Sequence, residues 1–473
     1  MHCRCDARRQ VRPRAGVTSS RTAPYVETER VQEVLDSPSN HNVQFGQKTP
    51  SAVGALAIEG GRLMQNDSVD ELVAEILIPR PDREPYDAYR RLREEAPVHR
   101  SEATGVWSLT RHEDVKSILH DRRFGRGAKL RSPGLAGLVG GLDAGRDRLR
   151  AMGDTMLFAD PPEHRRLRGL VSRAFTPKRI DALRPTIERL VEPLLDDLAG
   201  AGSGDVLDLF AFPFPVAVIG ELLGVPAPDQ AAFRSLVRDS TAFIEAAPSE
   251  ADLDRAEAAL SKMTAYFNDL VDQRSKHPAD DLLSAMLAVD AGGDRLTREE
   301  IVSTAILLFG AGFETTTNLI GNGLLTLLRH PDELARLRTD PTLVPDAVEE
   351  ILRYESPVQI NARTALHDAD LLGEPIESGT LVVTFLGAAN RDPLRYEEPE
   401  TFDVGRADVQ PLSFGWGIHH CLGAELARVE GQIAFERLLE RFPRMDLVND
   451  RASWRPSLTL RGLAELQVQV TSA

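Results

Sequence analysis

The sequence predicts a mainly α-helical fold with small β-sheets. Apolar residues recur with the period of a helix in several long segments, whereas strand-like runs such as Val106–Leu109 and Leu381–Leu386 are short. The chain has 473 residues, of which 42% are hydrophobic, and no run of 18 apolar residues that could span a membrane. The segments with a helical period are Pro85–Glu95, His112–His120, Arg184–Leu198, Phe210–Leu223, Pro228–Thr241, Glu250–Lys276 and a long one from Thr297 toward His330.

Residues 1–63 differ in composition from the rest of the chain. Five Arg and one Asp stand among the first 14 residues, and Ser, Pro, Thr and Asn follow without a sustained period. We expect a disordered extension, since it also lacks the apolar stretch of a secretory signal. Gly60 and Gly61 are encoded by purine-rich codons shortly before Met64, which resembles a bacterial ribosome-binding site, so a natural start at Met64 is the alternative. Residues 64–473 are expected to form one large domain.

Charge and cysteine usage limit the partners and the compartment. The formal net charge of −16 argues against nucleic acid and anionic membranes as partners. The three cysteines are Cys3, Cys5 and Cys421, which do not make a disulfide framework. We therefore expect a cytoplasmic protein, because a reducing compartment fits this usage.

Asp160 is expected to cap a helix that carries His164 and Arg168. Aspartate is a good N-cap, and Pro161 fits the first helical turn. His164 and Arg168 are four residues apart and therefore share a helix face. From the residues, the pair is either solvated charge, which is the commoner case, or a site for a carboxylate, which the arginine guanidinium suits.

The long helix has an unusual centre. Thr297 and Glu300 form a capping box, and Pro331 ends the helix after about thirty residues, roughly 45 Å. The stretch Gly310–Thr317 contains two glycines, one acid and three threonines, and an interior glycine costs up to about 1 kcal/mol relative to alanine. Several local preferences fail at one place, as is typical of functional sites. A helix kink beside a buried salt bridge is the alternative.

The stretch Phe414–Gly423 surrounds Cys421 just before a helical segment, Ala424–Phe442. The amides and dipole at a helix start favour a thiolate, which is a strong ligand for a soft metal centre. Gly415 and Gly417 allow the backbone to approach a large flat group that a Cβ would strike. A single cysteine is more often an inert buried side chain, so the interpretation depends on the whole pattern.

That pattern, Phe-Gly-x-Gly-x-His-x-Cys-x-Gly, resembles the haem-binding loop of the cytochrome P450 family, the haem-thiolate monooxygenases. Ala311, Gly312, Glu314 and Thr315 are similar to that family's Ala-Gly-x-Asp/Glu-Thr element. The resemblance runs from about Ser68 to Val470. It implies the cytochrome P450 fold, a catalytic domain over residues 64–473, and haem b held between the long helix and the cysteine loop.

The resemblance also implies roles for single residues. Cys421 is expected to be the axial ligand of the haem iron. Thr315 would orient bound oxygen or water, and Glu314 would relay protons from solvent. The other residues expected to bind the cofactor are His164, Arg168, Ala311, Arg363, Phe414, Gly415, His419 and Gly423. Glu350 and Arg353, three apart on one helix, are expected to join Arg406 in a buried structural network.

Substrate contacts are expected from apolar residues near these elements. The loop Arg126–Gly145 is rich in glycine and leucine, and an apolar loop of this kind often covers a ligand. In the family, the connection near Phe243 forms a lid over the access channel. The expected wall residues besides Ala311 are Leu135, Leu138, Val139, Phe243, Leu308, Val358, Ile360 and Leu458.

The resemblance implies a bacterial monooxygenase that hydroxylates or epoxidises an apolar small molecule, in secondary metabolism or xenobiotic oxidation. Because the chain has no flavin, iron–sulfur or dinucleotide motif, electrons from NAD(P)H are expected to arrive through ferredoxin and ferredoxin reductase. We expect a monomer. One alternative is a peroxide-driven peroxygenase, against which Glu314 and Thr315 argue. The other is a non-enzymatic haem-thiolate protein that binds or senses a ligand, against which Thr315 argues.

Overall fold

The structure, a computed structural model, describes residues 69–77, 84–102, 104–126, 155–240 and 249–472. The expected disordered extension and Met64 lie outside the described residues. So do four expected wall residues, Leu135, Leu138, Val139 and Phe243.

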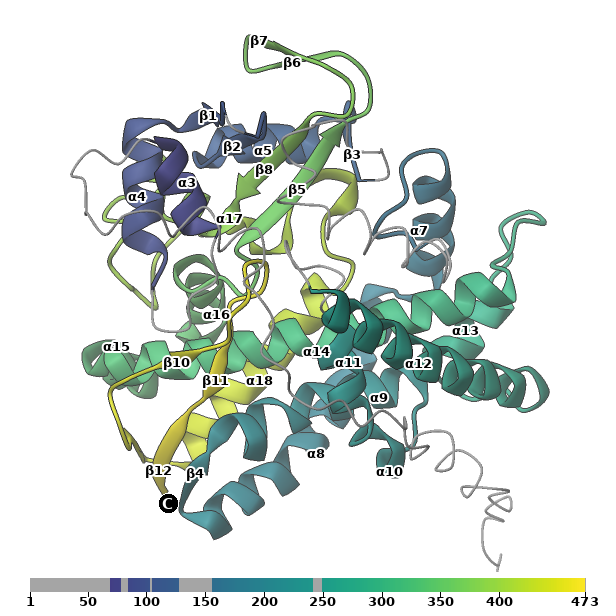
Figure 1. Ribbon diagram of the computed structural model, residues 1–473. Coiled ribbons are helices and arrows are strands. Elements are labelled where there is room, and N and C mark those ends of the chain that lie inside the picture. The colour runs from purple at the N-terminus through teal and green to yellow at the C-terminus, as the bar shows by residue number, and fades with distance from the viewer. Residues whose placement is uncertain (1–68, 78–83, 103, 127–154, 241–248, 473) are drawn as a thin grey trace, which may run out of the picture. The chain divides into compact units, whose positions relative to one another are not determined.

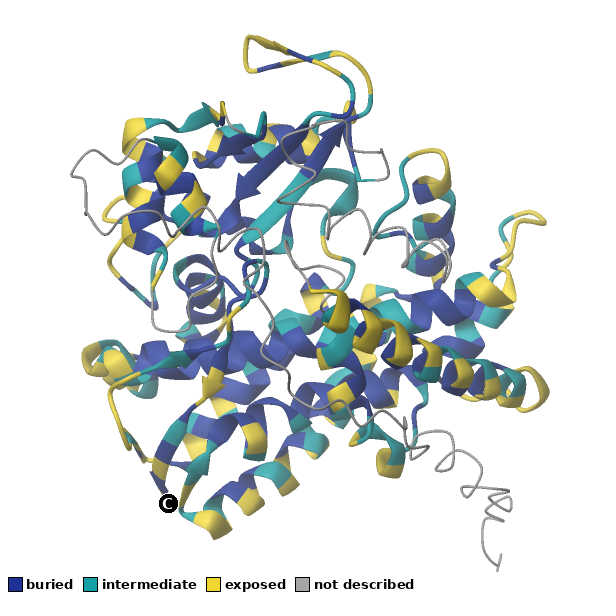
Figure 2. Ribbon diagram, viewed as in Figure 1, coloured by how far each residue is buried: buried dark blue, intermediate teal, exposed yellow. Residues whose placement is uncertain are grey.

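Helix α14 (Arg298–Arg329) lies at the centre of the helical part of the molecule (Figure 1). Thr297 caps it, and the reciprocal bonds of the predicted capping box with Glu300 are both present. Most of its residues are buried (Figure 2), because other helices pack around it. These neighbours are α9 (Pro213–Leu223), α12 (Glu250–Lys276), α16 (Val344–Tyr354) and α18 (Ala424–Arg441).

The other helices of the described chain surround this centre or cover a sheet (Figure 1). The earlier ones are α3 (Val69–Ile76), α4 (Tyr86–Glu95), α5 (His112–His120), α7 (Glu163–Ala174), α8 (Pro177–Ala201), the π-helix η1 (Leu207–Ala211), α10 (Ala227–Gln230) and α11 (Phe233–Ser240). The later ones are α13 (Leu282–Ala288), α15 (Pro331–Thr339), α17 (Leu386–Ala389) and the short 3-10 helices η3 (Pro341–Leu343), η4 (Leu412–Phe414) and η5 (Gly417–His419).

The largest sheet has five strands in the order β1-β2-β8-β5-β3. The β2–β8 pair is parallel and the other pairs are antiparallel. Its strands are β1 (Val98–Arg100), β2 (Trp107–Leu109), β8 (Leu381–Phe385), β5 (Ile360–Ala365) and β3 (Phe124–Gly125). The smaller sheets are β4-β12-β9 (Ser203–Asp205, Gln467–Thr471, Arg444–Leu447), β10-β11 (Ser453–Trp454, Leu463–Glu465) and β6-β7 (Ala369–Leu371, Glu374–Ile376).

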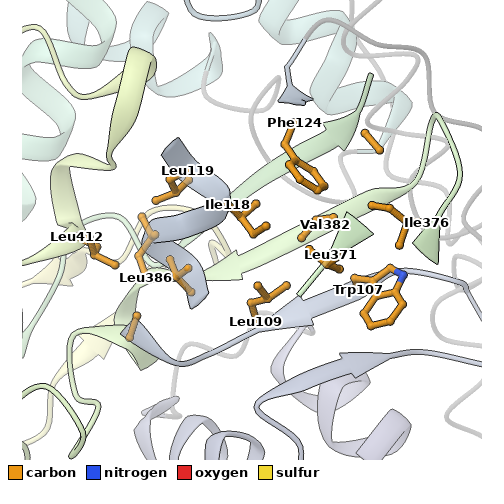
Figure 3. Close-up of a cluster of buried hydrophobic side chains, with 13 residues drawn as sticks. Trp107, Leu109, Ile118, Leu119, Phe124, Leu371, Ile376, Val382, Leu386 and Leu412 are labelled. Atoms are coloured by element: carbon orange, nitrogen blue, oxygen red, sulfur yellow. The ribbon is translucent and has the colours of Figure 1, made fainter. Parts of the chain in front are cut away.

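An apolar core joins this sheet to α5 (Figure 3). Ile118 and Leu119 of α5 pack with Leu109 of β2 and Val382 of β8, and all four are nearly inaccessible to solvent. Leu412 of η4 belongs to the same cluster, so the core holds the start of the cysteine loop against the sheet.

The predicted fold class, mainly helical with small sheets, is confirmed. The bounds of α5 and α12 agree with the predicted segments, but the prediction for Asp160 is wrong. Helix α7 begins at Glu163 after Pro162, and no side chain caps it. The Asp160 carboxylate instead accepts a hydrogen bond from the Arg126 backbone N–H at 2.8 Å. Among the described helices, none combines the length and apolar character needed to cross a bilayer.

Candidate functional site

A cavity lies between the centre of α14 and the cysteine loop. Its volume is about 260 Å³, near the lower end of the roughly 300–1,000 Å³ that is usual for small-molecule sites. The wall from α14 consists of Leu307, Leu308, Ala311, Gly312, Thr315, Thr316 and Leu319, and the wall from the cysteine loop and α18 includes Phe414, Gly415, His419, His420, Cys421, Leu422, Gly423, Leu426, Ala427 and Glu430.

Cys421 is exposed to this cavity, two residues after η5 and three before α18 begins. Its backbone N–H donates to the Phe414 carbonyl at 2.9 Å, which closes the loop. Burial raises the pKa of the Cys421 thiol, and the Gly423 amide and nearby arginines only partly oppose this. Helix position is therefore insufficient to produce the expected thiolate. A bound metal ion would deprotonate the sulfur directly.

The two glycines of the loop, Gly415 and Gly417, have different neighbours. Both have positive φ, 67° at Gly415 and 71° at Gly417. A Cβ on Gly415 would make only an ordinary contact, 3.9 Å from the His419 carbonyl oxygen, and this residue lines the cavity. A Cβ on Gly417 would overlap with the Leu119 carbonyl oxygen. The expectation that both glycines admit a flat group is therefore wrong for Gly417, which accommodates the end of α5.

A cluster of basic side chains gathers beside the cavity. The rings of His164 (α7) and His419 lie 4.2 Å apart, and the Nε2 atom of each is buried without a hydrogen-bond partner in the described structure. Burial lowers the pKa of His164, and burial with nearby arginines lowers that of His419 to about 2, so both rings are neutral.

Two arginines complete this cluster. Arg168 of α7 lines the cavity and donates to the His420 carbonyl at 2.6 Å. Arg363 of β5 is 2% exposed and donates to the Ala362 carbonyl and the Asn361 side-chain oxygen, both of them neutral. Burial lowers the pKa of Arg363 to about 10. One buried and one half-buried cation, together with two unpaired imidazole nitrogens, are suited to binding carboxylates.

The two expected catalytic residues point to different surroundings. Thr315 lines the cavity, and its hydroxyl donates to the Ala311 carbonyl at 2.9 Å. Glu314 is 5% exposed and does not belong to the described cavity wall. Its carboxylate forms an ion pair with Arg455, which follows β10. The structure therefore brings Thr315 to the site and keeps Glu314 behind it.

The expected substrate wall is reproduced in part. Leu308 and Val358 line the cavity. Ile360 and Leu458 do not belong to its described wall, which corrects the expectation for both. Ile360 packs against the apolar cluster of α3 and α4, and Leu458 is 8% exposed in a bend before Leu460, which forms a β-bridge with Val358. The residues that sequence reasoning missed include several from distant elements, namely Met156, Leu157, Phe175, Ile219, Leu352, Pro357, Asn361, Leu386 and Ser413.

A buried acid was also missed. Glu430 of α18 lines the cavity, is 3% exposed, and its Oε2 atom is without a hydrogen-bond partner within the described chain. Burial raises the pKa of Glu430 well above the usual range of a carboxyl. The sequence offered no signal for it, because acids are common in helices with an exposed face.

Glu350, Arg353 and Arg406 lie together away from the cavity. Glu350 and Arg353 are both 0% exposed, and the two nitrogens of Arg353 donate to the carboxylate at 2.6 and 2.7 Å. Arg406 donates to the same carboxylate at 3.2 Å and to three backbone carbonyls. This arrangement ties α16 to the segment that leads to the cysteine loop.

Known proteins are similar to this chain over most of its length. Residues 250–457 match the family model Cytochrome P450. Cytochrome P450 107B1 of Saccharopolyspora erythraea is 44% identical over 394 residues, which cover 81% of this chain and 94% of that protein. The 6-deoxyerythronolide B hydroxylase of the same organism is 40% identical, with coverage of 81% and 96%. The solved structure of P450BioI with an acyl carrier protein that carries hexadec-9Z-enoic acid has a TM-score of 0.74 and 38% identity, with coverage of 82% and 98%.

Proposed function

The chain belongs to the cytochrome P450 family of haem-thiolate monooxygenases, and from this premise we propose that it inserts one oxygen atom of O2 into an apolar small molecule of bacterial secondary metabolism or into a xenobiotic of similar character. The predicted family, fold and enzyme class are confirmed. The observation that carries the proposal is one cavity that Cys421 shares with Ala311 and Thr315. We also propose that residues 64–473 form the catalytic domain.

We propose haem b as the cofactor, with Cys421 as its axial ligand. Haem-thiolate chemistry supplies the activation of O2 when the cofactor is bound. Ala311, Phe414, Gly415 and Gly423 are assigned as cofactor contacts, because all of them line the cavity that contains the cysteine.

The basic cluster is assigned to the carboxylates of the cofactor. A carboxylate accepts hydrogen bonds from Arg168 and Arg363, and its charge offsets the cost of burying the Arg363 guanidinium. It also satisfies the buried Nε2 atoms of His164 and His419, which otherwise cost about 1–3 kcal/mol each.

Thr315 is assigned as the residue that positions oxygen or water. Its hydroxyl proton is used by the Ala311 carbonyl. The hydroxyl oxygen keeps its two lone pairs and accepts a hydrogen bond from a water or a protonated group in the cavity. Glu314 is assigned as the acid that exchanges protons with this side of α14. Its carboxylate forms an ion pair with Arg455.

The substrate is proposed to be largely apolar. The described wall is dominated by aliphatic and aromatic side chains, with Asn361 as one of its few polar groups. Two similar proteins, the 6-deoxyerythronolide B hydroxylase and P450BioI in complex with an acyl carrier protein that carries hexadec-9Z-enoic acid, support a substrate that resembles 6-deoxyerythronolide B or an acyl chain. Electrons are proposed to come from NAD(P)H through ferredoxin and its reductase. We propose that the enzyme is a cytoplasmic monomer.

The test begins with the cofactor. Purified protein supplied with haemin is reduced under CO, and the red-shifted band of a thiolate-bound haem is expected. The Cys421→Ser variant is expected to lose that band while it keeps its helical circular dichroism. Protein that stays colourless, or that shows an imidazole-bound spectrum, contradicts the assignment.

The reaction is tested next. Ligands that shift the Soret band are incubated with NADPH, ferredoxin, its reductase and ¹⁸O2, and one labelled oxygen is expected in the product. Products formed with peroxide but not with NADPH would establish a peroxygenase. Binding without any product across a broad ligand set would favour a ligand-sensing protein.

A further inference from the structure

We propose that α14 carries an internal file of water that supplies protons to Glu314 from a separate surface cavity. The inference rests on the proposed function, because it adds the route to the acid assigned there. Five polar residues, which we name the polar stripe, recur at every fourth position of α14 and at its end: Glu314, Asn318, Asn322, Thr326 and His330.

The polar stripe is buried along most of its length. A spacing of four residues puts successive side chains about 6 Å apart along the axis and turns their direction by about 40° at each step, so that the polar stripe winds slowly around the helix. Glu314, Asn318, Asn322 and Thr326 are 5%, 3%, 0% and 5% exposed. Polar groups are costly in such a position unless they are hydrogen-bonded, and an apolar helix would pack there without that cost.

The segment around β10 and β11 covers the stripe with two arginines. Arg455 pairs with Glu314 and donates to the Asn318 side-chain oxygen at 2.8 Å. The Asn322 amide donates to the Arg461 carbonyl at 3.0 Å. These bonds use part of the hydrogen-bonding capacity of each side chain and hold the stripe in register with the covering segment.

Other polar atoms of the stripe and of its two covering arginines have no hydrogen-bond partner. The Asn318 Nδ2, Asn322 Oδ1, Arg455 Nε and Arg461 Nη2 atoms are all buried and have no partner within the described residues. Leaving one such group unpaired costs about 1–3 kcal/mol, so native proteins pair nearly all of them, many with ordered water. Polar partners spaced by about 6 Å are within reach of one another through one or two bridging waters.

The stripe ends at a polar cavity of about 230 Å³. Thr326 and His330 line it from the stripe, and the exposed acids Glu84 and Asp87 line it from outside. Glu355 lines the same cavity and pairs with Arg461, so the covering segment reaches it as well. The stripe therefore connects a solvent-accessible polar site to the acid behind the candidate active site.

Only protons move along this route. A proton from solvent enters at the 230 Å³ cavity, each water accepts one proton and releases another, and Glu314 changes from carboxylate to carboxylic acid. Glu314 then releases its proton toward the Thr315 side and returns to its ion pair with Arg455. One solvent proton enters for each proton consumed, and no electron or heavy atom is transferred.

The experiment has a crystallographic arm and a kinetic arm, both on the haem-loaded enzyme. A high-resolution crystal structure is expected to show ordered waters bonded to Asn318 Nδ2, Asn322 Oδ1 and Arg461 Nη2. A stripe without these waters overturns the proposal.

The kinetic arm measures NADPH-driven oxygen consumption in H2O and D2O. Thr326→Val and Asn322→Leu are expected to slow it about tenfold, less than the ~10²–10⁴-fold contribution of a positioned acid, and to raise the solvent isotope effect. Ligand affinity, measured by the Soret shift, should not change. Thr326→Ser keeps the hydroxyl and should behave like the wild type. Thr304→Val is the matched control, because Thr304 is buried on α14 on the other side of Glu314.

An unchanged isotope effect in both stripe variants overturns the relay even if the waters are present. Failure of the proposed function is recognised separately. Oxygen consumption that yields only peroxide or water contradicts oxygen insertion, yet it still consumes protons and reports on the stripe. If no oxygen is consumed, the waters decide the structural claim.

Discussion

The buried carboxylate of Glu350 allows a sharp comparison with its neighbour Glu349. Both acids lie on α16 and pair with arginines, but their surroundings differ. Glu350 and Arg353 are 0% exposed, while the side chains of Glu349 and Arg428 are 22% and 26% exposed. Glu350 binds two arginines and Glu349 binds one. The substitution to glutamine removes the charge and preserves the shape of either side chain.

The expected magnitudes follow from this difference. Removing one partner of a buried ion pair costs about 3–5 kcal/mol, because the remaining charge is left without compensation. Glu350→Gln leaves the guanidinium groups of Arg353 and Arg406 without their shared carboxylate, and its amide still accepts hydrogen bonds. We therefore expect a loss near the lower end, about 3 kcal/mol. A pair that solvent reaches is worth about 0–1 kcal/mol, which sets the expectation for Glu349→Gln.

The assay is urea unfolding of both variants and the wild type, followed by circular dichroism at one haem occupancy. The free energies of unfolding are compared at fixed pH and salt. An equal loss in the two variants, or a loss below 1 kcal/mol in Glu350→Gln, would refute the reasoning that burial makes the Glu350 network essential to the fold. Lower haem retention in Glu350→Gln alone is expected, since this network ties α16 to the segment before the cysteine loop.

Three further predictions concern the site. Burial raises the pKa of Glu430, so the folded protein keeps a proton that the unfolded chain releases above about pH 4.3. The free energy of unfolding should therefore fall as the pH rises from that value. In urea unfolding between pH 5 and 8, the Glu430→Gln variant should show a flatter pH dependence than the wild type. A steeper fall in the variant than in the wild type would contradict this. Thr315→Ala is expected to release peroxide and lower the product formed per NADPH; unchanged coupling would remove its positioning role. Gly417→Ala should cost about 1–3 kcal/mol or more, because it combines a φ of 71° with a clash at Leu119, whereas Gly415→Ala has the strain without the clash and should cost less in the same unfolding assay.

The sequence determined the elements whose signals are local. The bounds of α5 and α12 and the capping box of α14 follow from apolar period and from side chains that bond their own backbone within a few residues. The cysteine loop was recognisable for the same reason, since its glycines, histidine and cysteine are contiguous. Even the polar stripe is visible as a spacing of four residues along the chain.

Tertiary structure decided what each of these residues meets. Aspartate is a residue type that often caps a helix, but the Asp160 carboxylate instead accepts a hydrogen bond from the Arg126 backbone N–H, 34 residues away. Ile360 is apolar and near the site in sequence, yet the side of β5 on which it lies packs against α3 and α4. The partner of Glu314 is Arg455, more than a hundred residues later. Periodicity and capping act between neighbours, while burial, charge pairing and cavity walls depend on which distant segments pack together, and no local pattern encodes that choice.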